Sequence, residues 1–412
     1  MNWEKLFARR TTLMRRNAVR ELLKVTAQPG IISFAGGLPA AELFPMARVR
    51  EALDRVCSTY GPASLQYSET EGVGALRDYL AARFSTKARP VTRENVLITT
   101  GAQQALDLIG RIFLEQGNGV IVENPTYLAL LSCWRPLGIE YLPIPSDAGG
   151  MDVSTLASCV KRQPKLIYTV PNFQNPQGST LSLERRRQLL EWSSQHGVPV
   201  IEDDPYGELR YDGQPLPGIW QLSERVGAPG HSSVIHVGTF SKVLMPGLRL
   251  GWVMAPENVI SKLVLAKQSA DLHSSTLNQY LALELLNANY LDEILPVLRR
   301  SYRERRDAML AALARFFPKG VRWTKPEGGM FLLVTFPAHE NTSEMLPRAL
   351  EQQVAYVPGA EFHADGTGEN TLRLNFSNST PEKIELGIQR LAAVFGAQAV
   401  FDTPSAQHIL RA

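Results

Sequence analysis

A lysine in an unusual position is the first residue of the sequence that could do chemistry. Lys242 ends the motif TFSK, which follows directly after the apolar run Ser233–Thr239. Lysine is rarely buried unless it is paired or functional, and burial lowers the pKa of its amine. Such an amine is nucleophilic and able to form a Schiff base. Taken alone, a solvated lysine at a strand end remains the more common interpretation.

Residues that suit a phosphate group lie close to this lysine. Thr239 and Ser241 supply hydroxyls and Arg249 supplies a guanidinium, which are typical phosphate ligands. The turn Gly101–Gln103 follows another apolar run, and a glycine there leaves free N–H groups at the N-terminus of the next helix. This turn lacks the GxGxxG and GxxxxGK[ST] spacings, which argues against dinucleotide and nucleoside triphosphate binding.

Asp203, at the end of another apolar run, is the candidate partner for a charged ring. An aspartate in a binding site can pair with a pyridinium nitrogen and keep it protonated. The alternative role, the N-cap of a following helix, suits Asp204 better. Tyr206 is placed to reach the neighbouring ring oxygen, and Asn175 is a second donor for it. Asn175-Pro176 is also a typical turn, which is compatible with that role.

The elements that precede these residues must bring them together. From about Asn95 to Ala255, apolar runs alternate with helical patterns, which predicts an α/β fold with a mostly parallel sheet covered by helices on both faces. Ligands bind outside the carboxyl ends of strands in such sheets, so five polar loops at this edge predict one site. The expected strands are Val96–Thr100, Val120–Glu123, Glu140–Ile144, Lys165–Val170, Val198–Glu202, Ser233–Thr239 and Leu248–Met254.

The rest of the chain predicts a smaller α+β domain built from both chain ends. One long helix over Tyr290–Phe317, bent near Pro296, leads into it. Its last helix begins at Thr380-Pro381, an N-cap followed by a proline. Its strands are expected near Val321–Trp323, Met330–Phe336, Ala355–Val357 and Leu372–Phe376. The predicted limits are 1–50 for the N-terminal part of the small domain, 51–295 for the large domain and 296–412 for the C-terminal part.

The composition is that of a globular protein. The 412 residues are 44% hydrophobic and 20% charged, which excludes a disordered or fibrous chain. The net charge of +3 is too small to predict a nucleic-acid partner. The three cysteines lack a CxxC spacing, which disfavours disulfides and a metal site and favours a reducing, cytoplasmic location. No apolar run reaches the roughly 18 residues that span a membrane, so we expect no membrane partner.

The basic N-terminal segment has no apolar h-region and is therefore not a secretory signal. An organellar transit peptide is one interpretation of it. An amphipathic first helix is favoured, because Glu4 and Glu21 interrupt the basic run. The last residues, Gln398–Ala412, are weakly patterned and predict a loose tail. The expected apolar side of the first helix consists of Trp3, Leu6, Phe7 and Leu13.

Several segments taken together resemble the class I/II pyridoxal-phosphate-dependent aminotransferases, which have the aspartate aminotransferase fold. These segments are TTGAQQAL, PNFQNPQG, EDDPYGEL, TFSKVLMPGLRLGW and LRLNFS. ISFAGGLP, LQYSETEG and NPTY are similar to a subgroup that contains 2-aminoadipate and kynurenine aminotransferases and the domains of MocR regulators. The resemblance runs in order from about Arg20 to Phe376. The combination is specific, although no single motif would be.

The resemblance implies pyridoxal 5'-phosphate as the cofactor and a role for each matching residue. Three residues match catalytic positions: Lys242 the Schiff-base lysine, Asp203 the partner of the ring nitrogen, and Tyr206 a ligand of the ring hydroxyl. Asn175 matches a second ligand of that hydroxyl, and Tyr127 matches the aromatic side chain that stacks on the ring. Around the phosphate the matching positions are Gly101, Ala102, Gln103, Thr239, Ser241, Arg249 and, from the other subunit of a homodimer, Tyr67.

The substrate-binding positions implied by the resemblance are Arg20, Gly37, Asn175 and Arg373, of which Arg373 grips the α-carboxylate. The sequence around Arg373 supports this role, because Arg373 alternates with Leu372 and Leu374 and so faces away from them. A surface arginine on an edge strand is the alternative. Ala102 departs from many relatives, which have a hydroxyl residue there, and one side-chain bond to the phosphate is lost.

The expected function is amino transfer from an amino acid to a 2-oxo acid, with 2-oxoglutarate as the acceptor, by a ping-pong mechanism. Another reaction on the same cofactor, such as elimination, decarboxylation or carbon–carbon bond formation, is the nearest alternative. A cofactor-sensing transcription regulator is a second alternative. It is disfavoured because only about thirty residues precede ISFAGGLP, too few for the DNA-binding module of MocR regulators. A scaffold without activity is disfavoured because Lys242, Asp203 and Arg373 are all present. The sequence leaves open which amino acid is the donor.

Overall fold

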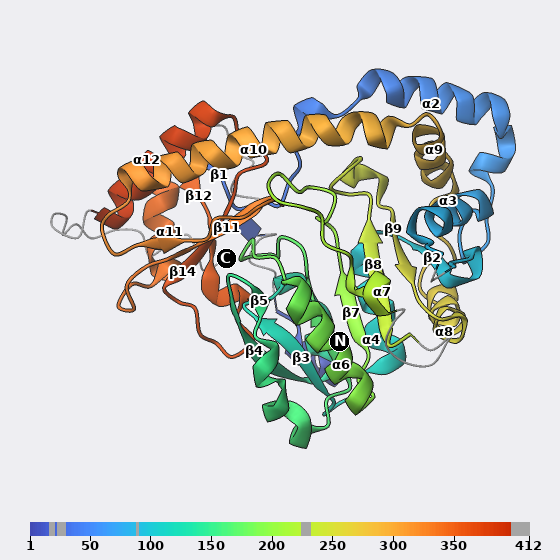
Figure 1. Ribbon diagram of the computed structural model, residues 1–412, viewed down its shortest axis with the longest axis horizontal. Helices are drawn as coiled ribbons and strands as arrows, with labels where there is room; N and C mark the ends of the chain where they lie inside the picture. The colour runs from blue at the N-terminus through green and yellow to red at the C-terminus, as the bar shows by residue number, and fades with distance from the viewer. Residues whose placement is uncertain (16–20, 23–29, 88–89, 224–231, 397–412) are drawn as a thin grey trace.

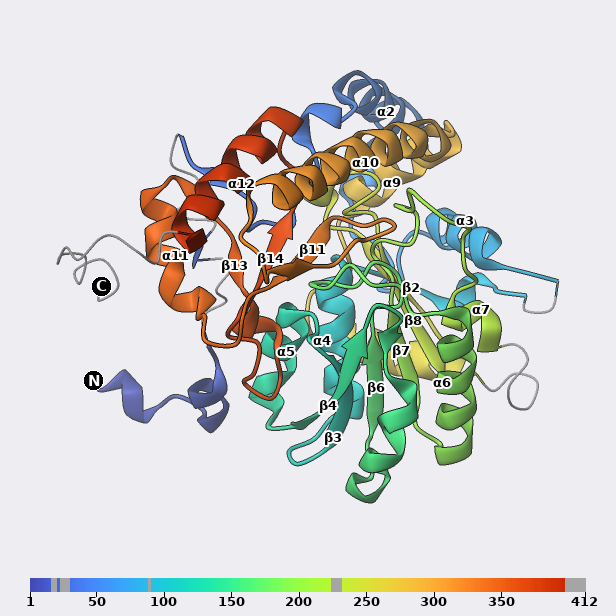
Figure 2. The ribbon, with the colours of Figure 1, turned by 60° about the vertical axis from the view of Figure 1, so that its left-hand side comes forward.

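The larger of the sheets has eight strands, and most of them run in one direction (Figure 2). The computed structural model describes residues 1–15, 21–22, 30–87, 90–223 and 232–396. The strand order is β2-β9-β8-β7-β6-β3-β4-β5, in which β9 and β5 are antiparallel to their neighbours. Bounds are β2 Val96–Thr99, β3 Gly119–Asn124, β4 Glu140–Asp147, β5 Gly150–Met151, β6 Leu166–Thr169, β7 Val200–Asp203, β8 Val234–Thr239 and β9 Gly251–Met254.

The central strands are buried along their whole length. Every residue of β6, β7 and β8 is buried, because helices cover both faces of the sheet and no face needs polar side chains. In Figure 2, α6 lies in front of the strands and α4 behind them. The helices are α2 Met46–Thr59, α3 Gly74–Phe84, α4 Ala102–Phe113, α5 Leu128–Trp134, α6 Leu183–His196, α7 Ile219–Leu222, α8 Glu257–Gln268, α9 Thr276–Asn287, α10 Tyr290–Phe316, α11 Thr342–Glu351 and α12 Pro381–Gly396.

A smaller antiparallel sheet, in the order β10-β11-β14-β13, lies on the other side of the molecule (Figure 1). Beside it, β1 and β12 form a parallel pair, so the N-terminal part of the chain joins the C-terminal part as expected. The predicted strand Ala355–Val357 is divided into two, since β12 pairs with β1 and β13 pairs with β14. The bounds are β1 Ile32–Ser33, β10 Arg322–Trp323, β11 Phe331–Thr335, β12 Val354–Ala355, β13 Val357–Pro358 and β14 Thr371–Asn375.

The long helix α10 connects the two regions. It runs without interruption through Pro296 from α9, beside the large sheet, to α12, beside the small one (Figure 1). Arg306 on this helix pairs with Asp212 and also donates to the Pro326 carbonyl oxygen at 2.9 Å. The fold class is therefore the predicted one, while the residue limits of the two domains remain a prediction.

The expected amphipathic first helix is wrong. Two short 3₁₀ turns, Trp3–Lys5 and Arg9–Leu13, take its place. The four apolar side chains expected on one face are all exposed, so within the described residues no packed surface offsets the entropy cost of ordering an isolated helix. The tail from 398 to 412 lies outside the described residues.

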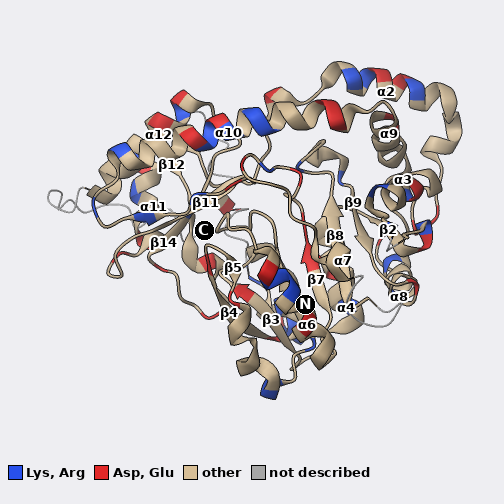
Figure 3. Ribbon diagram, viewed as in Figure 1, with Lys and Arg blue, Asp and Glu red and all other residues tan. Residues whose placement is uncertain are grey.

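Charge on the surface is mixed in sign. Figure 3 shows Lys and Arg alternating with Asp and Glu along α2 and α10, in keeping with the small net charge. Several of these charges pair, for example Arg48 on α2 with Glu293 on α10 at 3.1 Å. In the ranges that the structure covers, no helix has both the length and the apolar character needed to cross a membrane.

A buried arginine supports the loop that follows β6. Arg186 of α6 is fully buried, and its guanidinium donates to the carbonyl oxygens of Leu181, Pro217 and Pro171 and to Asn172 Oδ1. Burial lowers its pKa below the ordinary value for arginine. Four acceptors from three segments are therefore satisfied by one side chain.

Arg186→Ala should lower the free energy of unfolding by about 3 kcal/mol or more, because several buried acceptors lose their donor and a cavity forms. Urea denaturation followed by circular dichroism measures this. Arg187→Ala is the matched control, since Arg187 is the next residue of α6 and is exposed. Equal destabilisation by the two changes would contradict the assigned role of Arg186.

Candidate active site

Five loops meet at the carboxyl edge of the large sheet. They follow β2, β3, β6, β7 and β8, which all run in the same direction. Most of the candidate cofactor-binding residues lie in these loops or at the adjoining helix ends, as expected for an open parallel sheet, whereas Gly37, Tyr67 and Arg373 come from other segments. Residues from the small sheet and from the segment after β1 close the site from the other side.

Asp203, the last residue of β7, has one satisfied and one free oxygen. Its side chain is buried, and its Oδ2 accepts a hydrogen bond of 2.7 Å from the hydroxyl of Tyr168. Its Oδ1 is buried without a hydrogen-bond partner among the described residues. Burial raises the pKa of Asp203 to about 7. A buried carboxylate oxygen without a donor is suited to a cationic N–H group of a ligand.

Lys242 lies in the turn after β8, with its amine held close to the segment after β1. Its Nζ donates to the carbonyl oxygen of Gly37 at 2.9 Å. Burial, together with the positive charges of Arg373 and Arg249, lowers the pKa of Lys242 to about 8. Gly37 has no room for a side chain, because a Cβ there would lie 2.9 Å from the Phe331 ring. The close approach of this backbone to Lys242 therefore requires glycine.

The turn after β2 lies against the guanidinium of Arg249. Gly101 has a φ of +76°, and a Cβ on it would lie 2.7 Å from Arg249 Nη2. Arg249 itself has a φ of +51°, an uncommon conformation for a residue other than glycine that is often found at functional sites. The backbone N–H groups of Ala102 and Gln103 lie in the first turn of α4, where no intrahelical acceptor is available. Guanidinium and helix N-terminus therefore converge, as the sequence predicted.

The hydroxyl residues after β8 stabilise their own turn. Thr239 Oγ1 contacts Leu250 O at 3.1 Å and accepts from the Ser241 backbone N–H at 3.1 Å. The side chains of Thr239 and Ser241 also contact each other, at 3.0 Å between their oxygens. Thr239 thus shapes the turn that carries Ser241 and Lys242. Its direct role toward a phosphate remains a prediction.

Asn175 joins the two sides of the site. Its Oδ1 accepts from Arg373 Nη1 at 2.8 Å, and its side chain also interacts with the hydroxyl of Tyr206. Arg373, on β14 of the small sheet, also donates to the carbonyl oxygen of Ala35. These bonds bring together the loop after β6, the loop after β7, the small sheet and the segment after β1.

The guanidinium of Arg373 lies over two phenyl rings. Its central carbon lies 4.2 Å from the centre of the Phe331 ring and 5.0 Å from that of Phe362. The Nε atom of Arg373 has no hydrogen-bond partner among the described residues. Burial lowers the pKa of the Arg373 guanidinium to about 10. The side chain is buried, as are those of its strand neighbours Leu372 and Leu374. Its free edge is suited to a planar carboxylate.

The remaining predicted residues lie around this centre. Tyr127 is the N-cap residue of α5. It lies near Tyr206 and Arg373, close enough for an electrostatic effect of its hydroxyl on the pKa of each. The side chain of Gln103 is exposed and interacts with Cys133. Tyr67 is 78% exposed, with its ring 5.7 Å from that of His273, so this chain leaves its hydroxyl end uncovered. Arg20 lies outside the described residues.

Three contributors were not predicted from the sequence: Tyr168, Phe331 and Phe362. Each lies in or near an apolar segment, and the sequence pattern indicates a core residue. The one available signal was the hydroxyl of Tyr168, because a buried tyrosine hydroxyl usually has a polar partner. The phenyl rings of Phe331 and Phe362 carry no such signal.

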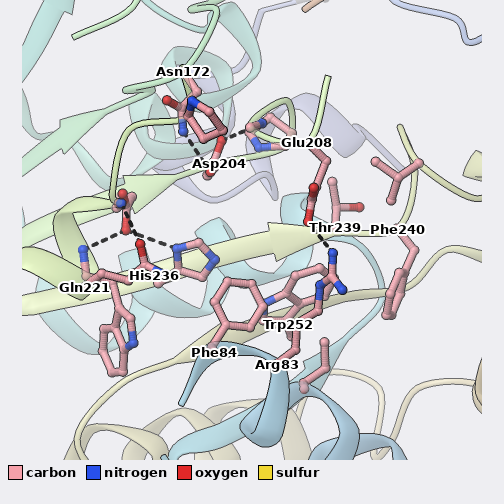
Figure 4. Close-up of a pocket in the computed structure, with 18 of the residues that line it drawn as sticks. Arg83, Phe84, Asn172, Asp204, Glu208, Gln221, His236, Thr239, Phe240 and Trp252 are labelled. Atoms are coloured by element: carbon pink, nitrogen blue, oxygen red, sulfur yellow. Dashed lines mark hydrogen bonds and ion pairs between the residues drawn. The ribbon is translucent and has the colours of Figure 1, made fainter. Parts of the chain in front are cut away.

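A pocket of about 280 Å³ lies behind the site, between α3, β8 and the loop after β7 (Figure 4). Phe84, Phe240 and Trp252 form its aromatic walls. Beside it, His236 and Glu202 pair at 3.1 Å. Its lining contains neither Lys242 nor Asp203, although it shares Thr239 with the centre described above. In the ranges that the structure covers, no group of His, Cys, Asp or Glu side chains is arranged to hold a metal ion.

Comparison with known proteins identifies the class. Residues 30–391 match the family described as Aminotransferase class I and II. The chain is 44% identical to 2-aminoadipate transaminase of Thermus thermophilus, covering 95% of this chain and 96% of that one. It is 42% identical to aromatic-amino-acid aminotransferase 1 of Thermococcus litoralis, covering 95% and 94%. The chain belongs to the class I and II aminotransferases.

A solved structure extends the likeness to the fold. Kynurenine aminotransferase of Pyrococcus horikoshii, in complex with pyridoxamine phosphate and substrates, is 44% identical, with a TM-score of 0.90 over 96% of this chain and 98% of that one. Helix-turn-helix regulators also match, among them YisV of Bacillus subtilis at 33% identity over 86% of this chain and 72% of its own length. The protein is an aminotransferase that uses pyridoxal phosphate.

The residues present suit this cofactor. Asp203 Oδ1 is a buried acceptor without a donor, as the ring nitrogen requires, and Lys242 is a buried amine. A side chain at position 101 would fill the turn. The glycine therefore keeps the N-terminus of α4 accessible to an anion beside Arg249. When bound, the cofactor supplies an electron sink for the carbanion that forms at the substrate Cα.

The lowered pKa of Lys242 predicts how the apoprotein takes up its cofactor. The amine is neutral and nucleophilic only above its pKa, so the rate of covalent attachment of pyridoxal phosphate should rise through about pH 8 and then level off. An unperturbed lysine would show the rise near pH 10.4.

Stopped-flow absorbance measures these rates, and Nα-acetyl-lysine at each pH corrects for ionisation of the reagent itself. Arg373→Met should move the midpoint to higher pH, because one nearby positive charge is removed. A midpoint near pH 10 in the unmodified protein would show that Lys242 is solvated.

Proposed function

We propose that the chain transfers the amino group of an amino acid to 2-oxoglutarate, with Lys242 as the proton carrier. The observation that carries this proposal is the position of Arg373, which is buried, bonds to Asn175 and lies close enough to Lys242 for its charge to lower the pKa of that amine. An arginine there suits the α-carboxylate that every amino acid and 2-oxo acid possesses. It would place the substrate Cα within reach of the lysine.

Each residue has a distinct task in this proposal. Lys242 forms the covalent link to the cofactor and, once released by the substrate, moves the proton away from the substrate Cα as a general base and acid. Asp203 keeps the ring nitrogen protonated, and Tyr206 and Asn175 bind the ring hydroxyl. Tyr127 stacks on the ring. The phosphate is bound by Gly101, Ala102, Gln103, Ser241 and Arg249, with Thr239 supporting the turn.

Broad substrate use is supported by the relatives, which are named for 2-aminoadipate, aromatic amino acids and kynurenine. A dicarboxylic acceptor and an apolar donor need different contacts at the far end of the site. We propose that Arg20 supplies a second guanidinium for dicarboxylic substrates and that the segment around it moves aside for apolar ones. Gly37 borders the same space.

A single half-reaction separates amino transfer from other reactions on the same cofactor. With one amino donor and no acceptor, the protein should form pyridoxamine phosphate and 2-oxo acid in near-equal amounts, measured by mass spectrometry. Lys242→Ala should slow this step by about 10²–10⁴-fold, the usual contribution of general acid–base catalysis. A panel of donors against 2-oxoglutarate then ranks the substrates. Products of elimination or decarboxylation without pyridoxamine phosphate would refute the proposal.

We also propose a homodimer with composite sites, acting in the cytoplasm. Tyr67 is exposed in this chain, although the resemblance assigns it to a phosphate of the other subunit. A two-fold dimer would place the two Tyr67 side chains in reciprocal positions. The three cysteines Cys57, Cys133 and Cys159 are unpaired, in keeping with a reducing compartment.

Mixed dimers test the composite site. Tyr67→Ala and Lys242→Ala chains, each nearly inactive, should recover about a quarter of the wild-type activity when refolded together in equal amounts, because mixed dimers place both defects in one of their two sites. A mixture of Asp203→Ala and Lys242→Ala is the control and should not recover, since each site keeps one defect. Absence of recovery in the first mixture would refute the crossing of Tyr67.

A further inference from the structure

The hydroxyl of Tyr168 is the one donor that the described structure gives to the Asp203 carboxylate. The distance from this hydroxyl to Asp203 Oδ2 is 2.7 Å, and both side chains are buried. Asp203 Oδ1 remains buried and without a partner. Among the described residues, the carboxylate is thus held at one oxygen only, and the other oxygen is available to a donor from a ligand.

The strand register explains why these two side chains meet. β6 and β7 are parallel neighbours, and Tyr168 is paired with Ile201. Asp203 lies two residues beyond Ile201, so its side chain is on the same face of the sheet as that of Tyr168. A tyrosine is long enough to cover that distance along the strand. Its ring is fixed from the other side by Trp134, with ring centres 6.1 Å apart.

We propose that Tyr168 is a positioning residue of the reaction: by holding Asp203 Oδ2, it directs Asp203 Oδ1 toward the nitrogen of the cofactor ring. The inference rests on the proposed role of Asp203. The hydrogen bond from Tyr168 also favours the ionised form of the Asp203 carboxylate and so opposes the effect of burial on its pKa. Tyr168 itself has a pKa well above the ordinary value, owing to burial and to Asp203, so its hydroxyl always donates.

This arrangement decides where the shared proton lies. Between Asp203 and a pyridine nitrogen, the proton favours the more basic partner. A hydrogen bond from Tyr168 makes the carboxylate less basic, which leaves the proton on the ring nitrogen. Without the hydroxyl, Oδ2 would be a buried acceptor without a donor, and the carboxylate would take the proton or turn away from the ring. Either change weakens the electron sink.

The test uses the full chain loaded with pyridoxal phosphate that carries ¹⁵N in the ring. Tyr168→Phe should move the ¹⁵N resonance toward that of a neutral pyridine and lower the rate of Cα proton removal by roughly tenfold, with KM changed less than twofold. Tyr356→Phe is the matched control, because Tyr356 is equally buried and its hydroxyl donates to the Thr342 carbonyl oxygen at 2.6 Å, away from the site. It should leave the ¹⁵N resonance and the rate unchanged.

Asp203→Asn separates the inference from the proposed function beneath it. If Asp203→Asn moves the resonance and Tyr168→Phe does not, Tyr168 is a structural residue only and the inference is wrong. If Asp203→Asn leaves the resonance unchanged, the role of Asp203 itself is wrong, and the inference falls with it. Should Tyr168→Phe fail to fold, 3-fluorotyrosine at position 168 keeps the ring and makes a stronger donor. It should move the resonance toward the protonated limit, whereas the same label at position 356 should not.

Discussion

Removal of water from three ionisable side chains is the constraint on which the rest of the site depends. Burial lowers the pKa of Lys242 to about 8 and that of Arg373 to about 10, and it raises the pKa of Asp203 to about 7. Each group has few partners among the described residues, and Asp203 and Arg373 each keep one buried polar atom without a hydrogen-bond partner there. In a site with little water, electrostatic interactions with such groups are stronger than in solution, and they need no rearrangement when the ligand arrives.

These three groups come from different parts of the fold, and their placement explains the architecture. Lys242 and Asp203 follow neighbouring parallel strands of the large sheet, whereas Arg373 lies on the small sheet. Asn175 links the two sides by accepting a hydrogen bond from Arg373. The small sheet is thus positioned against the large one through the site itself, and also through α10, whose Arg306 bonds to Asp212 and to the backbone at Pro326.

The support behind the reacting residues is built from backbone and aromatic groups. The carbonyl oxygens of Gly37 and Ala35 accept from Lys242 and Arg373, and the Arg373 guanidinium lies over two phenyl rings. None of these groups carries charge. They orient charged side chains without neutralising them, so the charges remain free for substrate and cofactor.

Much of the site could be predicted from the sequence because its chemistry is local. Lys242, Asp203 and the Gly101 turn each follow an apolar run, and parallel strands bring such loops to one edge whatever the details of packing. The alternation of Arg373 with two leucines likewise predicted that its side chain faces away from them. The first helix was predicted wrongly from an equally local pattern, because an apolar face forms a stable helix only if something covers it.

Tertiary structure alone decided what surrounds those residues. The pairing of Tyr168 with Asp203 depends on the register between β6 and β7, and the hydrogen bond from Arg373 to Asn175 joins residues that lie 198 positions apart. Such contacts depend on which strands become neighbours and on the distance between two sheets. The sequence by itself therefore determined the kinds of groups in the site and the edge at which they gather. Their orientation, their loss of water and the resulting pKa shifts arise only when distant segments pack together, because desolvation is a property of the packed site as a whole.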